Sequence, residues 1–106
     1  MEQIRLYGVK IDNVTMEEAI YQSLRATGEP CVVFTPNALM LERARRDAKL
    51  AELLNRASLS LPDGAGVLWA AEKMGTPLCE RVAGIDFGAS LLARVERAGL
   101  RVFLLG

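Results

Sequence analysis

Two short polar segments of this sequence follow apolar runs, and their side chains are of types that do chemistry. The first is Thr35-Pro36-Asn37, after residues 31–34, and the second is Pro62-Asp63-Gly64, after residues 59–61. They offer a hydroxyl, an amide and a carboxylate, and an aspartate at a partly buried strand end can act as a general base for a hydroxyl group. The simpler interpretation is that Asp63 caps the next helix or shapes an Asp-Gly turn, which the local pattern alone favours because such caps are common.

Glycines next to Asp63 offer a second kind of site. Gly64 and Gly66 would let a ligand approach the backbone, and a helix starting near Gly66 presents free N–H groups to an anion. The segment is not a complete dinucleotide-binding fingerprint, because Trp69 stands where the third glycine is required. A nucleotide-binding fragment of an oxidoreductase is therefore disfavoured.

The arginines have two interpretations each. Arg81 could clamp a diphosphate through two guanidinium nitrogens, or pair at the surface with Glu80 or Asp86, and the sequence leaves both open. The basic residues of segment 43–49 could meet phosphate or an anionic membrane. The spacing of Glu42 with Arg46, and of Arg43 with Asp47, favours ion pairs on an exposed helix face instead.

Composition narrows the choice of function. The 106 residues carry 13 basic and 13 acidic side chains, which argues against a nucleic-acid binder, and they fit one domain. The chain has no histidine, so the commonest general base and metal ligand are missing, and we expect no metal and no cofactor.

Cys31 and Cys79 form no metal or disulfide motif and suit a reducing compartment. No basic signal region or apolar stretch of ~20 residues is present, so we expect a cytosolic or peripheral protein.

The elements that must position these residues alternate along the chain. We expect strands at 4–7, 9–11, 31–34, 59–61 and 101–105, and helices at 15–28, 39–44, 67–74 and 86–99, with a further helix capped by Asp47 and running to residue 57. This order predicts an α/β, Rossmann-like fold with a mainly parallel sheet and helices on both faces. Parallel strands bring their carboxyl ends to one edge, so Thr35, Asn37 and Asp63 are expected to meet there, beside a pocket. Trp69 and Met74 are expected in the core.

Residues 102–105 of the last expected strand are all apolar, which predicts cover on both faces. We interpret residues 1–106 as the front portion of a single domain, apparently truncated at the C-terminus. An uncovered apolar edge invites pairing with another chain, so we expect the 106-residue chain alone to self-associate and to be inactive.

Four segments, in this order and spacing, resemble motifs of the WecG/TagA/CpsF glycosyltransferases: Thr35-Pro36-Asn37 and residues 61–67, 80–86 and 102–106. The resemblance implies a hexosyltransferase that moves N-acetylmannosamine from a UDP-sugar donor to undecaprenyl-diphosphate-linked N-acetylglucosamine. It also implies a role in teichoic acid or surface polysaccharide synthesis, peripheral on the inner face of the cell membrane. The alternatives are a catalytically incomplete fragment and a nucleotide-binding module.

Site residues follow from the resemblance by position. It implies that Asp63 is the catalytic base and that Thr35 and Asn37 line the same pocket. Three further residues match the substrate-binding motifs, namely Gly64, Arg81 and Asp86. One departure is Leu39, since the family usually has Glu two residues after the Asn.

Overall fold

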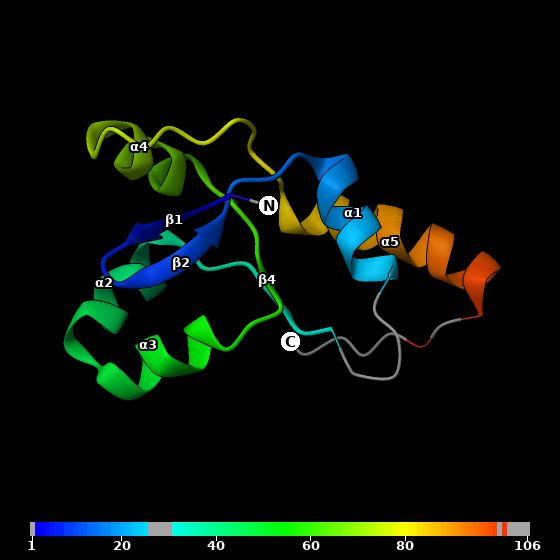
Figure 1. Ribbon diagram of the computed structural model, residues 1–106, viewed down its shortest axis with the longest axis horizontal. Helices are drawn as coiled ribbons and strands as arrows, with labels where there is room; N and C mark the ends of the chain where they lie inside the picture. Colours follow the sequence, from blue (N-terminus) through cyan, green and yellow to red (C-terminus); the bar gives the residue numbers. More distant parts are fainter. Residues whose placement is uncertain (1, 26–30, 100, 102–106) are drawn as a thin grey trace.

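The computed structural model describes residues 2–25, 31–99 and 101. Figure 1 shows a β-hairpin with helices around it at one end, other helices lying together at the opposite end, and a short strand between the two ends. The elements, in chain order, are β1 (Gln3–Leu6), β2 (Val9–Asp12), α1 (Met16–Leu24), β3 (Val33–Phe34), α2 (Ala38–Arg46), α3 (Ala48–Asn55), β4 (Leu59–Ser60), α4 (Ala65–Lys73) and α5 (Gly84–Ala98).

The hairpin β1–β2 confirms the expected short return strand and shows that it is antiparallel. Its two-residue turn places Tyr7 at φ 52° and Gly8 at φ 83°. Positive φ at both central residues gives a turn whose twist matches that of the flanking strands. The alternating apolar residues of both strands turn to one face, where Leu6, Val9 and Ile11 are fully buried.

The parallel pair β3–β4 confirms only part of the expected sheet. Val33 pairs with Leu59 and Phe34 with Ser60. Among the described residues each sheet has two strands, so the fold is mixed α/β and a mainly parallel Rossmann-like sheet is not confirmed. The expected burial of the run 31–34 on both faces is wrong, because Val32 is 45% exposed and β3 is only half-buried. The expected strand 101–105 lies outside the described residues except for Arg101, which has no regular structure.

Polar side chains start most of the helices, as their positions predict. The Thr15 hydroxyl accepts a hydrogen bond from the Glu18 N–H, and Glu18 accepts one from the Thr15 N–H, which confirms the capping box. Asp47 caps α3 through two N–H groups. The expectation that α5 begins at Asp86 is wrong. The helix begins at Gly84, and Asp86 lies in its first turn, where a carboxylate complements the helix dipole. The expected end of α1 at Gly28 lies outside the described residues.

Two hydrophobic clusters form the core. One joins the hairpin to α2, α3 and α4, and the other joins α1, β4 and α5. The expectation that Trp69 and Met74 pack in the core is wrong, because they are 62% and 56% exposed. Helix α4 buries Val67 and Ala71, one turn apart, and turns Trp69 outward. Since α4 is apolar on most of its surface, periodicity alone did not identify its buried face.

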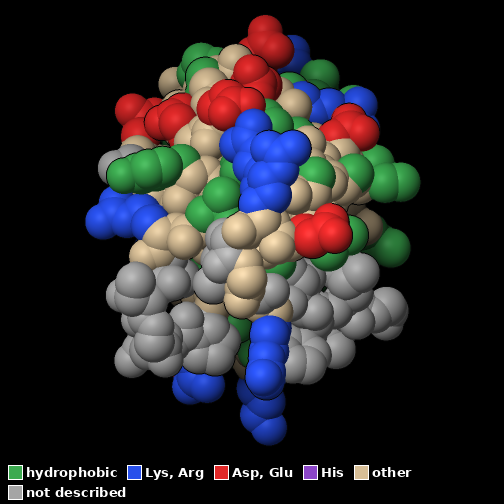
Figure 2. Space-filling model, turned by 90° about the vertical axis from the view of Figure 1, so that its right-hand side faces the viewer, with side chains coloured by type: hydrophobic (Ala, Val, Ile, Leu, Met, Phe, Trp, Pro, Cys, Tyr) green, Lys and Arg blue, Asp and Glu red, His purple; other side chains and the backbone are tan. Residues whose placement is uncertain are grey.

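The end of the molecule formed by α1 and α5 has a mixed surface. Figure 2 shows acidic and basic side chains interspersed there with apolar ones. An ion pair of 3.5 Å between Arg94 and Glu17 joins the two helices. Within residues 2–25 and 31–99, no helix combines the length and the apolar character needed to cross a bilayer.

Candidate functional site

The parallel register brings the ends of β3 and β4 side by side. The Leu61 N–H donates to the Phe34 carbonyl at 2.9 Å, which continues the pairing past the last strand residue. Thr35 directly follows Phe34, Asp63 lies two residues after Leu61, and the two meet over the start of α5. A Cβ atom placed on Gly84 would lie 2.8 Å from the Thr35 Cγ2 and 3.2 Å from the Asp63 Oδ2. The hydroxyl and the carboxylate therefore lie at one edge, as strand polarity requires.

The Asp63 carboxylate is hydrogen-bonded by a residue distant in sequence, at the start of α5. Its Oδ2 accepts a hydrogen bond of 3.0 Å from the Gly84 N–H, and the side chain is 27% exposed. The N-cap of α4 is Gly64, and no side chain caps this helix. The interpretation of Asp63 as its cap is therefore wrong. Gly64 adopts φ 91°, a conformation that favours glycine.

Arg81 lies on the other side of the carboxylate. Its Nε is 3.7 Å from the Asp63 Oδ1, and its side chain is 57% exposed. This is a loose ion pair, worth about 0–1 kcal/mol at such exposure. The alternative surface pairing of Arg81 with Glu80 or Asp86 is not found within the described residues. The terminal nitrogens of Arg81 make no hydrogen bond within the same residues, so both remain available to an anion.

Asn37 and Gly66 border the same edge. The Asn37 Oδ1 accepts the Met40 N–H at 2.9 Å and caps α2. A Cβ on Gly66 would lie 3.1 Å from that of Ala38, so α2 and α4 begin next to each other. With α5 beginning at Gly84, three helix N-termini surround the edge, and their dipoles favour a negatively charged ligand. Asp86 is exposed in the first turn of α5, and its side chain makes no hydrogen bond or ion pair among the described residues.

Gly84 is the residue that sequence reasoning missed. It stands inside the segment 80–86 that carries the family resemblance, yet a lone glycine at a helix start gives no signal of its own. A side chain at this position would meet both Thr35 and Asp63, so the glycine permits their close approach to the start of α5. Only the three-dimensional arrangement shows this.

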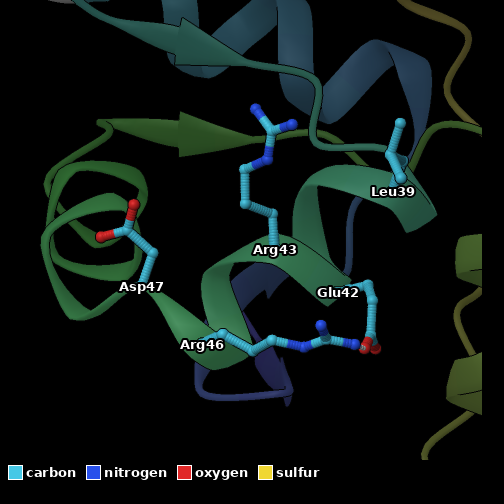
Figure 3. Close-up of a pocket in the computed structure, with 5 residues that line it drawn as sticks. All are labelled: Leu39, Glu42, Arg43, Arg46 and Asp47. Atoms are coloured by element: carbon cyan, nitrogen blue, oxygen red, sulfur yellow. Dashed lines mark hydrogen bonds and ion pairs between the residues drawn. The ribbon is translucent and has the colours of Figure 1, made fainter.

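A pocket of about 340 Å³ lies away from these residues, along α2. Its lining comprises Leu39, Glu42, Arg43, Arg46 and Asp47, which Figure 3 shows as sticks. The expected Glu42–Arg46 pair is confirmed at 3.0 Å, and Arg45 shares the same carboxylate. The expected Arg43–Asp47 pair is absent from the described residues, since Asp47 accepts from two backbone N–H groups instead. Two arginines and two carboxylates balance the charge of this pocket.

Comparison with known proteins identifies the relationship. Residues 4–106 match the glycosyl transferase WecG/TagA/CpsF family. A protein of Bacillus spizizenii named N-acetylglucosaminyldiphosphoundecaprenol N-acetyl-beta-D-mannosaminyltransferase is 34% identical over 74 residues, covering 70% of this chain and 29% of that protein. A protein of the same name from Staphylococcus aureus strain NCTC 8325 is 29% identical over 109 residues, covering 98% of this chain and 42% of that protein. The chain thus spans less than half the length of these relatives. It belongs to the WecG/TagA/CpsF family of glycosyl transferases.

Proposed function

We propose that this chain provides the catalytic base and part of the donor pocket of a hexosyltransferase. The reaction moves N-acetylmannosamine from UDP-N-acetylmannosamine to undecaprenyl-diphosphate-linked N-acetylglucosamine, in teichoic acid or surface polysaccharide synthesis. Family membership and the names of the relatives support this reaction class. The lipid-linked acceptor would bring the protein to the inner face of the membrane.

The observation that carries the proposal is the orientation of Asp63. The Gly84 N–H engages Oδ2, whereas Oδ1 accepts no hydrogen bond within the described residues and has only the loose ion pair with Arg81 at 3.7 Å, so Oδ1 is the oxygen that can accept a proton. As the acceptor hydroxyl oxygen attacks the anomeric carbon of the donor sugar, its proton passes to Oδ1. The bond from the anomeric carbon to the diphosphate oxygen breaks, and UDP leaves with the bonding electrons. General-base assistance of this kind contributes about 10²–10⁴-fold in rate.

The leaving diphosphate needs positive charge close to Asp63. Arg81 supplies a permanently charged guanidinium within 3.7 Å of the carboxylate. The N-termini of α2, α4 and α5 add backbone N–H groups, and Gly64 lets a ligand come close to the backbone. Thr35 and Asn37 would contact the donor from the end of β3, the amide through the nitrogen that capping leaves unused.

A non-catalytic, ligand-binding role is the second candidate. The Gly84 hydrogen bond is also one that a purely structural carboxylate would make. The two candidates differ in one respect, since a binding module keeps its function when Asp63 loses its charge and a transferase does not.

The test is Asp63→Asn in the complete gene product. The amide keeps the volume and an oxygen for the Gly84 N–H but accepts no proton. We expect acceptor-dependent UDP release to fall by about 10²–10⁴-fold, with UDP binding nearly unchanged. Asp47→Asn is the matched control, because asparagine caps a helix as well as aspartate does. Near-normal turnover by the Asp63 variant would contradict the assignment of the base.

A further inference from the structure

Asp12, at the end of β2, is a fully buried carboxylate with relative exposure of 0%. Its Oδ2 accepts the Ser60 N–H at 2.8 Å, and its Oδ1 accepts the Gln3 side-chain amide at 3.0 Å. Ser60 ends β4, the strand that leads into Asp63. Because successive N–H groups of a strand point to opposite sides, β4 is held by β3 on one side and by this carboxylate on the other.

Asn13, the next residue, holds a different segment. Its Oδ1 accepts the Cys79 N–H at 2.8 Å, while its Nδ2 donates to the Glu2 carboxylate at 2.7 Å. Cys79 lies just ahead of Arg81. The two held segments also join each other, since the Val82 N–H donates to the Pro62 carbonyl at 3.0 Å.

We propose that Asp12 and Asn13 are positioning residues, which set the geometry of Asp63 and Arg81 by holding the two segments that carry them. This inference rests on the proposed function. The pair, here called the Asp12–Asn13 clamp, uses two adjacent side chains, one at the end of β2 and one just after it, to reach both segments. Hydrogen bonds from a common support fix the relative position of the base and the guanidinium, as reaction geometry requires.

Because Asp12 is buried, its substitution is expected to destabilise the fold as well as to move the segment that it holds. A buried charge is costly unless hydrogen bonds compensate it, and here a backbone N–H and an amide do so. Beside it, the buried Ser60 hydroxyl has no hydrogen-bond partner within the described residues. If the Asp12 carboxylate were removed, the Ser60 N–H would also lose its hydrogen-bond partner, and both polar groups of Ser60 would be buried and unsatisfied.

The experiment uses Asn13, which is partly exposed and the safer residue to change. In the complete gene product, we expect Asn13→Ala to lower kcat by about 10–100-fold, since a misplacement near 1 Å costs on that order. Asn13→Asp keeps the oxygen that accepts the Cys79 N–H but replaces the donor to the Glu2 carboxylate with a like charge, so it should recover part of the rate. Amide hydrogen exchange should accelerate at Cys79 and stay unchanged at Ser60, and Asp12→Ala should give the reverse pattern.

Asn55→Ala is the matched control. Asn55 also joins the hairpin to another segment, through the Lys10 N–H at 2.8 Å and the Gly8 carbonyl at 2.9 Å, but it makes no hydrogen bond to Thr35, Asp63 or Arg81 within the part of the chain that the structure describes. It should destabilise the fold and leave kcat per folded molecule unchanged. In the Arg81→Ala background, Asn13→Ala should cost little more, because residues that act through one another are non-additive.

Two results would overturn the inference: a kcat for Asn13→Ala equal to that of Asn55→Ala, or full additivity with Arg81→Ala. The Asp63→Asn variant separates this failure from that of the proposed function. If Asp63→Asn is inactive while Asn13→Ala keeps full kcat, only the positioning role is wrong. If Asp63→Asn stays active, the assignment of the base is wrong.

Discussion

Gly84→Ala should disturb the site more than the fold. The added methyl would lie 2.8 Å from the Thr35 Cγ2 and 3.2 Å from the Asp63 Oδ2. An ordinary contact begins near 3.4 Å, so Thr35 must recede by at least 0.6 Å and the Asp63 carboxylate by a smaller amount. The exposed Thr35 can move, and the hydrogen bond from the Gly84 N–H to Asp63 must adjust with it.

The two effects differ in size. Overpacking costs about 1–3 kcal/mol, and alanine regains up to about 1 kcal/mol over glycine through helix propensity. The net loss in free energy of unfolding is therefore about 0–2 kcal/mol. A displacement approaching 1 Å at a reacting group costs about 10²-fold in rate, so we expect kcat to fall by about 10–100-fold.

Urea denaturation and an acceptor-dependent assay of UDP release measure the two effects separately. Gly88→Ala is the matched control, because it lies in the same helix with open space around its Cβ position. It should stabilise the fold by about 0.5–1 kcal/mol and keep full activity. Thr35→Ser removes Cγ2, and combining it with Gly84→Ala should restore part of the lost rate. A Gly84→Ala variant with unchanged kcat would refute the close approach as a determinant of the site.

Two predictions concern stability alone, and urea denaturation checks both. Gly8→Ala should destabilise the hairpin by about 1–2 kcal/mol, because φ 83° is a left-handed conformation; an unchanged midpoint would show that the turn relaxes freely. Asp47→Ala should cost about 1 kcal/mol by removing the cap of α3, whereas Asp47→Asn should cost almost nothing. Equal losses in the two Asp47 variants would argue against the cap.

Local structure could be predicted from the sequence where a few neighbouring residues determine it. Thr15 with Glu18 gave the capping box, and Asp47 gave the start of α3. The convergence of Thr35 and Asp63 followed from strand polarity, a rule that needs no side-chain detail.

The features of the fold and of the candidate site that could not be predicted depend on contacts between segments distant in sequence. Nothing near Trp69 in sequence indicates that α4 buries its other face, and nothing near Asp63 indicates that its partner is the Gly84 N–H. The extent of the parallel sheet was overestimated because an apolar run such as 31–34 does not reveal how many neighbours its strand will have.

The hydrogen bonds of the Asp12–Asn13 clamp also bear on how the chain folds. They join residues 48 and 66 positions apart, and the Met16 N–H reaches Glu80 across 64. Contacts of such high sequence separation form late, because a long loop must lose its entropy before they are gained. The hairpin and its turn, by contrast, close locally. We therefore expect the secondary structure of the first half to be established while Asp63 and Arg81 are still unaligned, which makes the reactive geometry among the last features to appear during folding.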